Sequence, residues 1–264
     1  TVCKTDSADS RRSLWEGDLT MSKKYELVNY NKETELWQIR ALRNFRDVKT
    51  GDLGGWVSGE HNLSHEETCW VFENAIVSGN ARIFDNAQVF GKARIFDNAR
   101  VFDNARVFGN AQIYGNAQVS GKAQVSGKAQ IYGDAQVYCD AWVHGDACVF
   151  GDAQIHGNAC IYGNARVYDY ACVFGDAWIY GNAQVFDDAR VFDNTQVYGD
   201  AWVFGDACVR FDMRICHAHH NEFIRFYDLG VHSITVDGEY LNIGCKSQAI
   251  KEWLEIASKV GKRE

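Results

Sequence analysis

The sequence predicts an all-β protein whose chain winds into one parallel β-helix of about eight three-sided coils. Three observations lead to this fold class. A Val or Ile recurs at every sixth position from Val71 to Val209, at 24 consecutive positions without a slip. An Ala stands two positions before each of them from Ala75 onward, and Thr195 is the one exception. Between units lies a short pair that usually begins with Gly and ends with Asn or Asp.

Each part of the repeat has a physical reading. Residues two apart on an extended segment point to the same side, so Ala and the aliphatic residue both face inward. Gly and Asn adopt left-handed backbone angles at low cost, so the pair makes a corner. Three such sides close one coil, and the stacked coils should form a rod roughly 38 Å long. A disordered tract would have no reason to keep 24 aliphatic positions in phase.

The unit Ala-x-Val-x-Gly-x resembles the hexapeptide repeat of left-handed β-helix proteins, the superfamily that includes trimeric acyltransferases. The resemblance covers residues 69–210 and implies a left-handed coil. One departure is that the residue after the aliphatic position is aromatic in 18 of 24 units, Phe72 and Tyr114 among them. Over its whole length the chain is similar to uncharacterised bacterial and prophage hexapeptide-repeat proteins that are often named as transferases.

The ends of the rod are expected to carry caps, because a solenoid otherwise exposes unpaired strand edges. We divide the chain into four parts. Residues 1–20 are an extension outside the fold, and residues 21–68 are an N-terminal β cap with a first irregular coil. Residues 69–210 form the β-helix, and residues 211–264 form a C-terminal cap. Met21 is a candidate start. In the N-terminal cap, residues 36–42 should form a strand and residues 54–57 should enter the coil. The step from Leu63 to Val71 is two positions longer than the repeat, which predicts a bulge.

The C-terminal cap is predicted to be a β-hairpin followed by an α-helix. Residues 233–236 and 240–243 have alternating patterns that flank Asp237, Gly238 and Glu239, a typical hairpin turn. Residues 247–259 have an amphipathic helical pattern with Ser247 as its N-cap. We expect both elements to lie over the last coil.

Composition narrows the class of partner and compartment. No apolar run long enough to span a bilayer occurs, so no membrane partner is expected. Residues 1–20 lack the apolar stretch of a secretory signal, and nine cysteines without such a signal predict a cytoplasmic protein with free thiols. A net charge of −8 argues against nucleic acid as the main partner.

Catalytic candidates come from the resemblance rather than from a motif. Hexapeptide-repeat acyltransferases use a coil histidine as general base, and the coil histidines here are His144 and His156. They stand two repeats apart and therefore on different sides of the rod. Both occupy the slot otherwise held by Phe or Tyr, so they are also explained as variation at that slot. The regular run has no insertion that could close over coenzyme A, which argues against acyl transfer.

Metal ligands are concentrated in one segment, where His217 and His219 point to the same side of an extended chain and could share a metal. Cys216 and His220 point elsewhere, and the spacing fits no structural zinc pattern. Aspartates at the corners suit calcium, but they also suit the turn itself. The sequence therefore predicts no bound cofactor, and coenzyme A or a divalent metal ion remains the alternative.

A binding surface is indicated by outward-facing tryptophans, Trp142, Trp178 and Trp202. The first two lie on one side, two coils apart, with Cys160 between them. Residues 69–132 carry a net charge of +3 and residues 133–209 a net charge of −9, so the rod could pair antiparallel with itself or offer its acidic half to a basic partner.

Two functions stay open. The first is a non-catalytic binding or scaffold protein that meets a protein partner, or forms an oligomer, through its lateral faces. The second is an acyltransferase with a coil histidine at a subunit interface.

Overall fold

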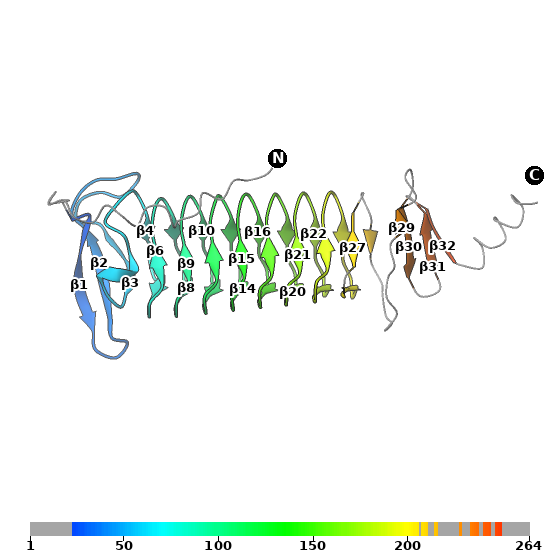
Figure 1. The fold of residues 1–264 in the computed structure, drawn as a ribbon. Helices are drawn as coiled ribbons and strands as arrows, with labels where there is room; N and C mark the ends of the chain where they lie inside the picture. Colours follow the sequence, from blue (N-terminus) through cyan, green and yellow to red (C-terminus); the bar gives the residue numbers. More distant parts are fainter. Residues whose placement is uncertain are drawn as a thin grey trace, which may run out of the picture.

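The chain forms a rod of stacked, three-sided coils (Figure 1). The computed structural model describes residues 23–205, 207–210, 214–215, 227–228, 233–237, 240–243 and 246–249. From Trp70 to Val209 a short strand begins at every sixth position, and each strand pairs in parallel with the third strand along the chain, one coil away. The predicted β-helix is therefore confirmed. Its left-handed sense stays a prediction from the resemblance.

Three long sheets make the three sides of the rod. The first has nine strands: β4 (Trp70–Val71), β7 (Gln88–Val89), β10 (Arg106–Val107), β13 (Gln124–Val125), β16 (Trp142–Val143), β19 (Cys160–Ile161), β22 (Trp178–Ile179), β25 (Gln196–Val197) and β28 (Arg214–Ile215). The second has eight: β6 (Arg82–Ile83), β9 (Arg100–Val101), β12 (Gln118–Val119), β15 (Gln136–Val137), β18 (Gln154–Ile155), β21 (Cys172–Val173), β24 (Arg190–Val191) and β27 (Cys208–Val209).

The third sheet has 11 strands because it also takes in the N-terminal cap. Its strands are β1 (Tyr25–Asn31), β2 (Leu36–Ala41), β3 (Leu53–Val57), β5 (Ile76–Val77), β8 (Arg94–Ile95), β11 (Gln112–Ile113), β14 (Gln130–Ile131), β17 (Cys148–Val149), β20 (Arg166–Val167), β23 (Gln184–Val185) and β26 (Trp202–Val203). One side of the rod alone stacks nine strands, so the rod has about nine coils where the repeat count predicts eight.

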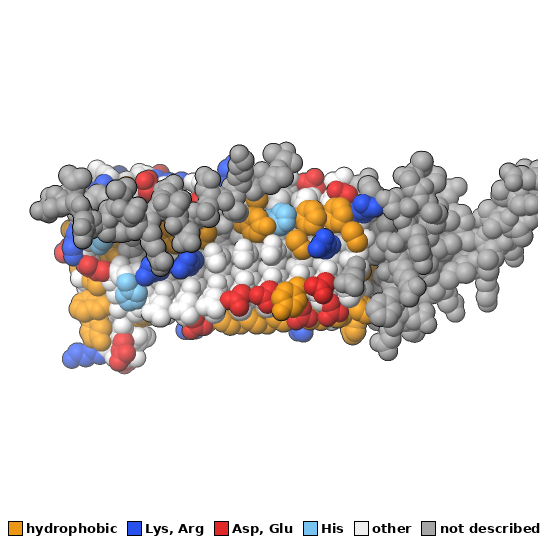
Figure 2. Space-filling model, in the orientation of Figure 1, with side chains coloured by type: hydrophobic (Ala, Val, Ile, Leu, Met, Phe, Trp, Pro, Cys, Tyr) orange, Lys and Arg blue, Asp and Glu red, His pale blue; other side chains and the backbone are white. Residues whose placement is uncertain are grey.

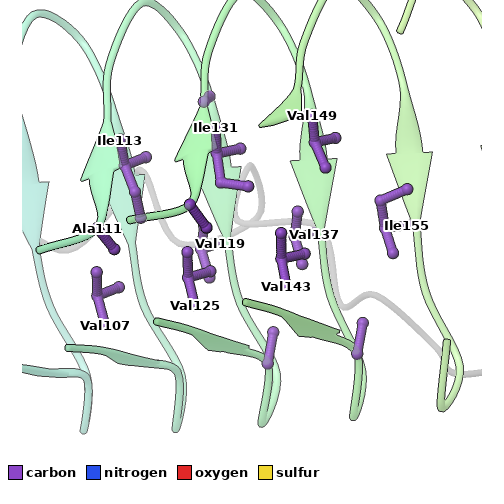
Figure 3. Packing of buried hydrophobic residues seen from close by; sticks show 14 of the residues in the cluster. Val107, Ala111, Ile113, Val119, Val125, Ile131, Val137, Val143, Val149 and Ile155 are labelled. Carbon is purple, nitrogen blue, oxygen red and sulfur yellow. The ribbon is translucent and has the colours of Figure 1, made fainter. Parts of the chain in front are cut away.

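The core lies inside the coils and follows the repeat. Aliphatic side chains of successive coils point inward and contact one another (Figure 3), and Val125 and Val143 on β13 and β16 are in register and fully buried. The alanines beside them are also buried. Thr195, which replaces Ala in one unit, is buried too, and its hydroxyl donates a hydrogen bond to the Phe192 carbonyl at 2.7 Å. The predicted inward pair is therefore confirmed.

The corners require a left-handed backbone angle in every coil. Gly127 has φ of +68°, and a Cβ added there would lie 2.7 Å from the Gly145 carbonyl oxygen of the next coil. Asp97 and Cys139 occupy the same kind of corner with φ of 58° and 62°. Glycine is favoured because it adopts this angle without strain and leaves room for the next coil.

The N-terminal cap is an antiparallel extension of one rod sheet. Strand β2 pairs with β1 on one side and with β3 on the other, and β3 pairs in parallel with β5 of the rod. Strand β2 lies within the strand expected at residues 36–42, and β3 covers the entry expected at residues 54–57, whereas β1 was not predicted. The predicted bulge is present, because the amides of Thr68 and Cys69 both donate to the Asp85 carbonyl, at 3.1 and 2.9 Å.

A short 3-10 helix, η2 (Glu60–Asn62), joins the cap to the first coil through Asn62. The buried side-chain oxygen of Asn62 accepts hydrogen bonds from the amides of Ser58 and Gly59, both at 3.0 Å. Its nitrogen donates to the carbonyls of Gly79 and Ala81 at 3.0 and 2.9 Å. One amide group therefore satisfies backbone atoms on both sides of the junction.

At the C-terminal end, four strands form a separate antiparallel sheet in the order β29 (Tyr227–Asp228), β30 (Ser233–Asp237), β31 (Tyr240–Ile243) and β32 (Lys246–Ala249). Strand β30 pairs antiparallel with β31, as expected for the predicted hairpin. The predicted start of the helix is wrong, because Ser247 lies in β32 and pairs with Asn242. This pairing gives backbone partners to an edge that a helix would leave open.

The rest of the predicted helix and the extension at residues 1–20 lie outside the described residues. No helix in the described ranges is long and apolar enough to cross a membrane.

Candidate binding face

Aromatic side chains that follow the aliphatic positions stack into ladders along the rod. On the 11-stranded sheet the rings of successive coils are nearly parallel, with centroids 4.8 to 5.2 Å apart. The members are Phe96, Tyr114, Tyr132, Phe150, Tyr168, Phe186 and Phe204. Stacked rings at this spacing stabilise neighbouring coils, so packing between coils accounts for these residues.

Ladder rings can reach the outward-facing residue on the adjacent strand of the next coil. The Tyr168 hydroxyl donates to the Gln184 side-chain oxygen at 3.2 Å, and Tyr180 donates to Gln196 at 3.5 Å. Each contact joins two adjacent coils on the outside of the rod. The outward residue that a ladder residue can touch therefore lies 16 positions later in the sequence, two fewer than one full coil.

The same geometry brings each coil histidine against a cysteine. His144 Nε2 lies 3.7 Å from Cys160 Sγ, and His156 Nε2 lies 3.8 Å from Cys172 Sγ. The sequence analysis did not pair either histidine with a cysteine. Both pairs have the sequence separation of the Tyr–Gln contacts, and this separation is the signal that would have found them.

The electrostatics of these pairs favour neutral groups. Burial lowers the pKa of the His144 and His156 imidazoles, and it raises the pKa of the Cys160 and Cys172 thiols. A reactive cysteine needs the opposite trend, with a thiolate stabilised by a cation. A neutral imidazole can act as a base, but the two histidines follow β16 and β18 in different sheets, as predicted, so they do not share a site.

Two tryptophans mark one side of the rod. Trp142 is 49% exposed and Trp178 is 46% exposed. Both lie on the nine-stranded sheet, where Cys160 on β19 pairs with each of them. We call this outer surface, around Trp142, Cys160 and Trp178, the tryptophan face. Trp202 is exposed as well, but it lies on β26 of the 11-stranded sheet and is not part of this face.

The indole rings of the tryptophan face do not join the ladder. Trp142 stands at 83° to the His144 ring, with centroids 6.4 Å apart, and Trp178 stands at 78° to the Tyr162 ring, at 6.3 Å. Edge-to-face contact fixes each indole from one side. About half of each residue remains accessible, which is the arrangement of a ring that can receive a partner.

Charged side chains line both edges of this face. Lys122 and Lys128 flank β13, and Asp140 and Asp146 flank β16, the next strand of the sheet. Lys122 lies 4.0 Å from Asp140, and Lys128 lies 3.9 Å from Asp146. Figure 2 shows acidic side chains gathered toward the C-terminal part of the rod on the side that it displays. The sign of the charge therefore changes along the rod, as the sequence predicts.

Cofactor and metal sites were predicted only as alternatives. His217 and His219 lie outside the described residues. Within the described ranges, no group of three or more His, Cys, Asp or Glu side chains is placed to hold a metal ion. From Trp70 to Cys208 each strand begins at the sixth position after the previous one, so this part of the rod has no extruded loop that could close over a coenzyme.

Comparison with known proteins finds similarity in parts of the chain. Residues 93–109, 111–127, 129–145 and 183–199 match a family model described as the YdcK beta solenoid repeat. A relative named "Uncharacterized acetyltransferase YdcK", from Escherichia coli strain K12, is 39% identical over 56 residues. That match covers 21% of this chain and spans only 17% of the length of the relative. Four stretches of the rod are therefore similar to the YdcK beta solenoid repeat, and a short segment of the chain is similar to this relative.

Proposed function

We propose that this protein is a non-catalytic binding or scaffold protein that meets a protein partner through the side of its rod. The observation that carries the proposal is the tryptophan face, where Trp142 and Trp178 are about half exposed on one sheet, at 49% and 46%. Tryptophan is enriched at the centres of protein interfaces, because it buries a large area and loses little conformational freedom. A scaffold of stacked strands holds both rings in fixed positions.

A partner rather than a small molecule suits this surface. Small-molecule sites are concave and enclose most of their ligand. The tryptophan face is the outside of a sheet, and the described coils around it have no insertion. Surfaces that bind protein partners are commonly flat, with aromatic residues at the centre and a polar rim. The lysines and aspartates at both edges supply such a rim.

The experiment compares capture of partners from a bacterial lysate by the full-length protein and by the Trp142→Ala/Trp178→Ala variant. The control is Tyr170→Ala, which removes an exposed aromatic side chain, 67% accessible, at a corner away from this face. We expect wild type and control to capture the same proteins after cross-linking, and the double variant to lose them. Unchanged capture by the double variant would rule out the tryptophan face as the binding surface.

Acyl transfer is the second candidate, and two observations favour it. A relative bears the name acetyltransferase, and burial keeps the pKa of His144 and His156 low, so that either imidazole is neutral and able to accept a proton. The site would have to form at an interface between copies, where a second rod supplies the missing wall of the coenzyme pocket.

Acyl transfer is tested with acetyl-coenzyme A and a panel of amine and hydroxyl acceptors. We expect no turnover above background and no thermal shift with coenzyme A. Turnover that is lost in His144→Ala or His156→Ala, and retained in His61→Ala, would establish the enzyme and overturn the non-catalytic proposal. His61 is the matched control because it lies in η2, outside the regular coils.

A further inference from the structure

The nine-stranded sheet carries two kinds of asymmetry along the rod. From β7 to β25 its outward residues are, in order, Gln88, Arg106, Gln124, Trp142, Cys160, Trp178 and Gln196. The cation therefore lies toward the N-terminal end and the indoles lie toward the C-terminal end. A surface with this pattern is complementary to a copy of itself turned end over end.

The edges of the sheet show the same asymmetry at one sharp boundary. Lys122 and Lys128 stand at the two edges beside β13, each with a side chain 74% exposed. Asp140 and Asp146 stand at the same two edges beside β16, with side chains 54% and 56% exposed. The charge on both edges therefore reverses between β13 and β16.

We propose that a second copy of this chain packs antiparallel against the nine-stranded sheet, about a twofold axis that lies along the strands between β13 and β16. This rests on the proposed function, since it names the partner of the tryptophan face. Such an axis keeps each edge on its own side and exchanges the two ends of the rod. Lys122 then faces the partner's Asp140, and Lys128 faces the partner's Asp146, at both edges and from both copies.

The same register accounts for the tryptophans. An axis between β13 and β16 places β10 opposite the partner's β19. Arg106 on β10 therefore faces the partner's Cys160, between the partner's Trp142 and the partner's Trp178. A guanidinium group is weakly hydrated and binds well against indole rings. Arg106 already has its guanidinium carbon 5.1 Å from the Phe90 ring centroid, on the outside of the rod. Edge charges and aromatic residues thus select one register independently.

The parallel arrangement is disfavoured by the same residues. A twofold axis along the rod would exchange the two edges and keep each coil at its own height. Lys122 would then face the partner's Lys128, and Asp140 would face the partner's Asp146. Arg106 would face the partner's Arg106. Like charges would meet at all four rim positions beside β13 and β16 and would repel, so these charges favour the antiparallel pair.

The size of the contact sets the expected affinity. The six strands from β7 to β22 cover a strip of roughly 29 by 15 Å, at about 4.8 Å between strands and about 3.3 Å per residue. Two such strips bury on the order of 900 Å², which is the size of a weak, reversible complex. We therefore expect a dimer with a dissociation constant of about 1–100 μM that weakens as salt increases.

Sedimentation of the full chain over about 1–300 μM tests the proposal, at low and at high salt. We expect a monomer–dimer equilibrium that Arg106→Glu weakens about tenfold or more. The control is Arg100→Glu, which makes the same change on the eight-stranded sheet and should leave the equilibrium unchanged. Circular dichroism confirms that each variant is folded.

The orientation is read from the sign of the Lys128 effect. Lys128→Asp should weaken the antiparallel dimer, because it then faces the partner's Asp146, whereas it would strengthen a parallel dimer, where it would face the partner's Lys122. The charge-exchanged variant Lys128→Asp/Asp146→Lys should recover most of the wild-type association. Recovery supports the antiparallel register, and tightening by Lys128→Asp alone contradicts it.

Two further outcomes would overturn self-association. A chain that remains monomeric at every concentration has no such interface, and equal effects of Arg106→Glu and Arg100→Glu would place the contact elsewhere. If the chain is monomeric while Trp142→Ala/Trp178→Ala still abolishes capture of another protein, only the self-association is wrong. If that variant changes neither capture nor sedimentation, the proposed function fails as well.

Discussion

Ile155 offers the sharpest test of the inward and outward positions of the repeat. Its side chain is fully buried on β18, in register with Val137 in one neighbouring coil and Val173 in the other. Ile155→Ala removes three carbons, each worth about 0.8 kcal/mol, so the loss of transfer free energy is roughly 2.4 kcal/mol. The cavity left behind adds to this cost. Backbone hydrogen bonds such as Gln154 N to Ala171 O, at 2.9 Å, fix the spacing between coils, so the coils cannot move together to fill it. We expect a total of about 3–4 kcal/mol.

The matched control is Gln154→Ala, on the same strand but with its side chain exposed. Its free energy of unfolding should change by less than about 0.5 kcal/mol. Guanidinium unfolding, followed by circular dichroism and by tryptophan fluorescence, gives both values and shows whether the rod unfolds in parts. Equal costs for the two substitutions, or a cost below about 1 kcal/mol for Ile155→Ala, would refute the assignment of inward positions.

Three other predictions concern the histidines, the corners and the cap. Burial lowers the pKa of His144 and His156, so the unfolded chain binds more protons below about pH 6.5, and stability should fall between about pH 7 and 5.5. His144→Phe/His156→Phe should flatten this part of a denaturation-midpoint profile, and an unchanged slope would contradict the assignment. Gly127→Ala should lower the free energy of unfolding by at least about 1 kcal/mol more than Gly51→Ala does, because both have positive φ but only at Gly127 would an added Cβ lie 2.7 Å from backbone of the next coil. Equal losses would show that the next coil moves aside at no cost. Asn62→Ala should cost at least about 2 kcal/mol, since it leaves buried backbone groups without partners, and a smaller thermal-unfolding effect than that of exposed Asn80→Ala would show that the junction does not depend on this amide.

The regular part of the rod could be predicted from the sequence, because the six-residue period determines where each strand and corner lies. A core position in every repeat fixes the strand, the corner and the register between successive coils. The side of the rod on which Trp142, Cys160 and Trp178 lie therefore followed by counting. The same counting separated His144 from His156. These predictions needed no knowledge of side-chain conformation.

The caps were harder to predict, because their pairing depends on contacts between distant segments. Strand β1 has no period that distinguishes it from a loop, and it is fixed by its antiparallel pairing with β2. The segment at Ser247 has the composition of a helix start, yet strand pairing with β31 prevails. Local propensity is a weak guide where an open sheet edge competes for the same residues.

The contacts on the surface were also hard to predict, because they depend on the direction in which each side chain points and not only on its position in the repeat. The sequence identified the aromatic slot but not the reach of its side chains toward the next coil. That reach joins His144 to Cys160 at 3.7 Å and His156 to Cys172 at 3.8 Å. The perpendicular setting of the indoles on the tryptophan face likewise required coordinates.

Oxidative footprinting of the full-length protein, with each tryptophan read by mass spectrometry, tests the tryptophan face most directly. Among the described residues, the three most exposed tryptophans begin nearly equal, at 49%, 46% and 43% accessible for Trp142, Trp178 and Trp202. As concentration rises through the range of association, we expect Trp142 and Trp178 to become protected together while Trp202 keeps its reactivity. Protection of Trp202 in their place, or constant reactivity of all three up to the highest concentration, would contradict the account.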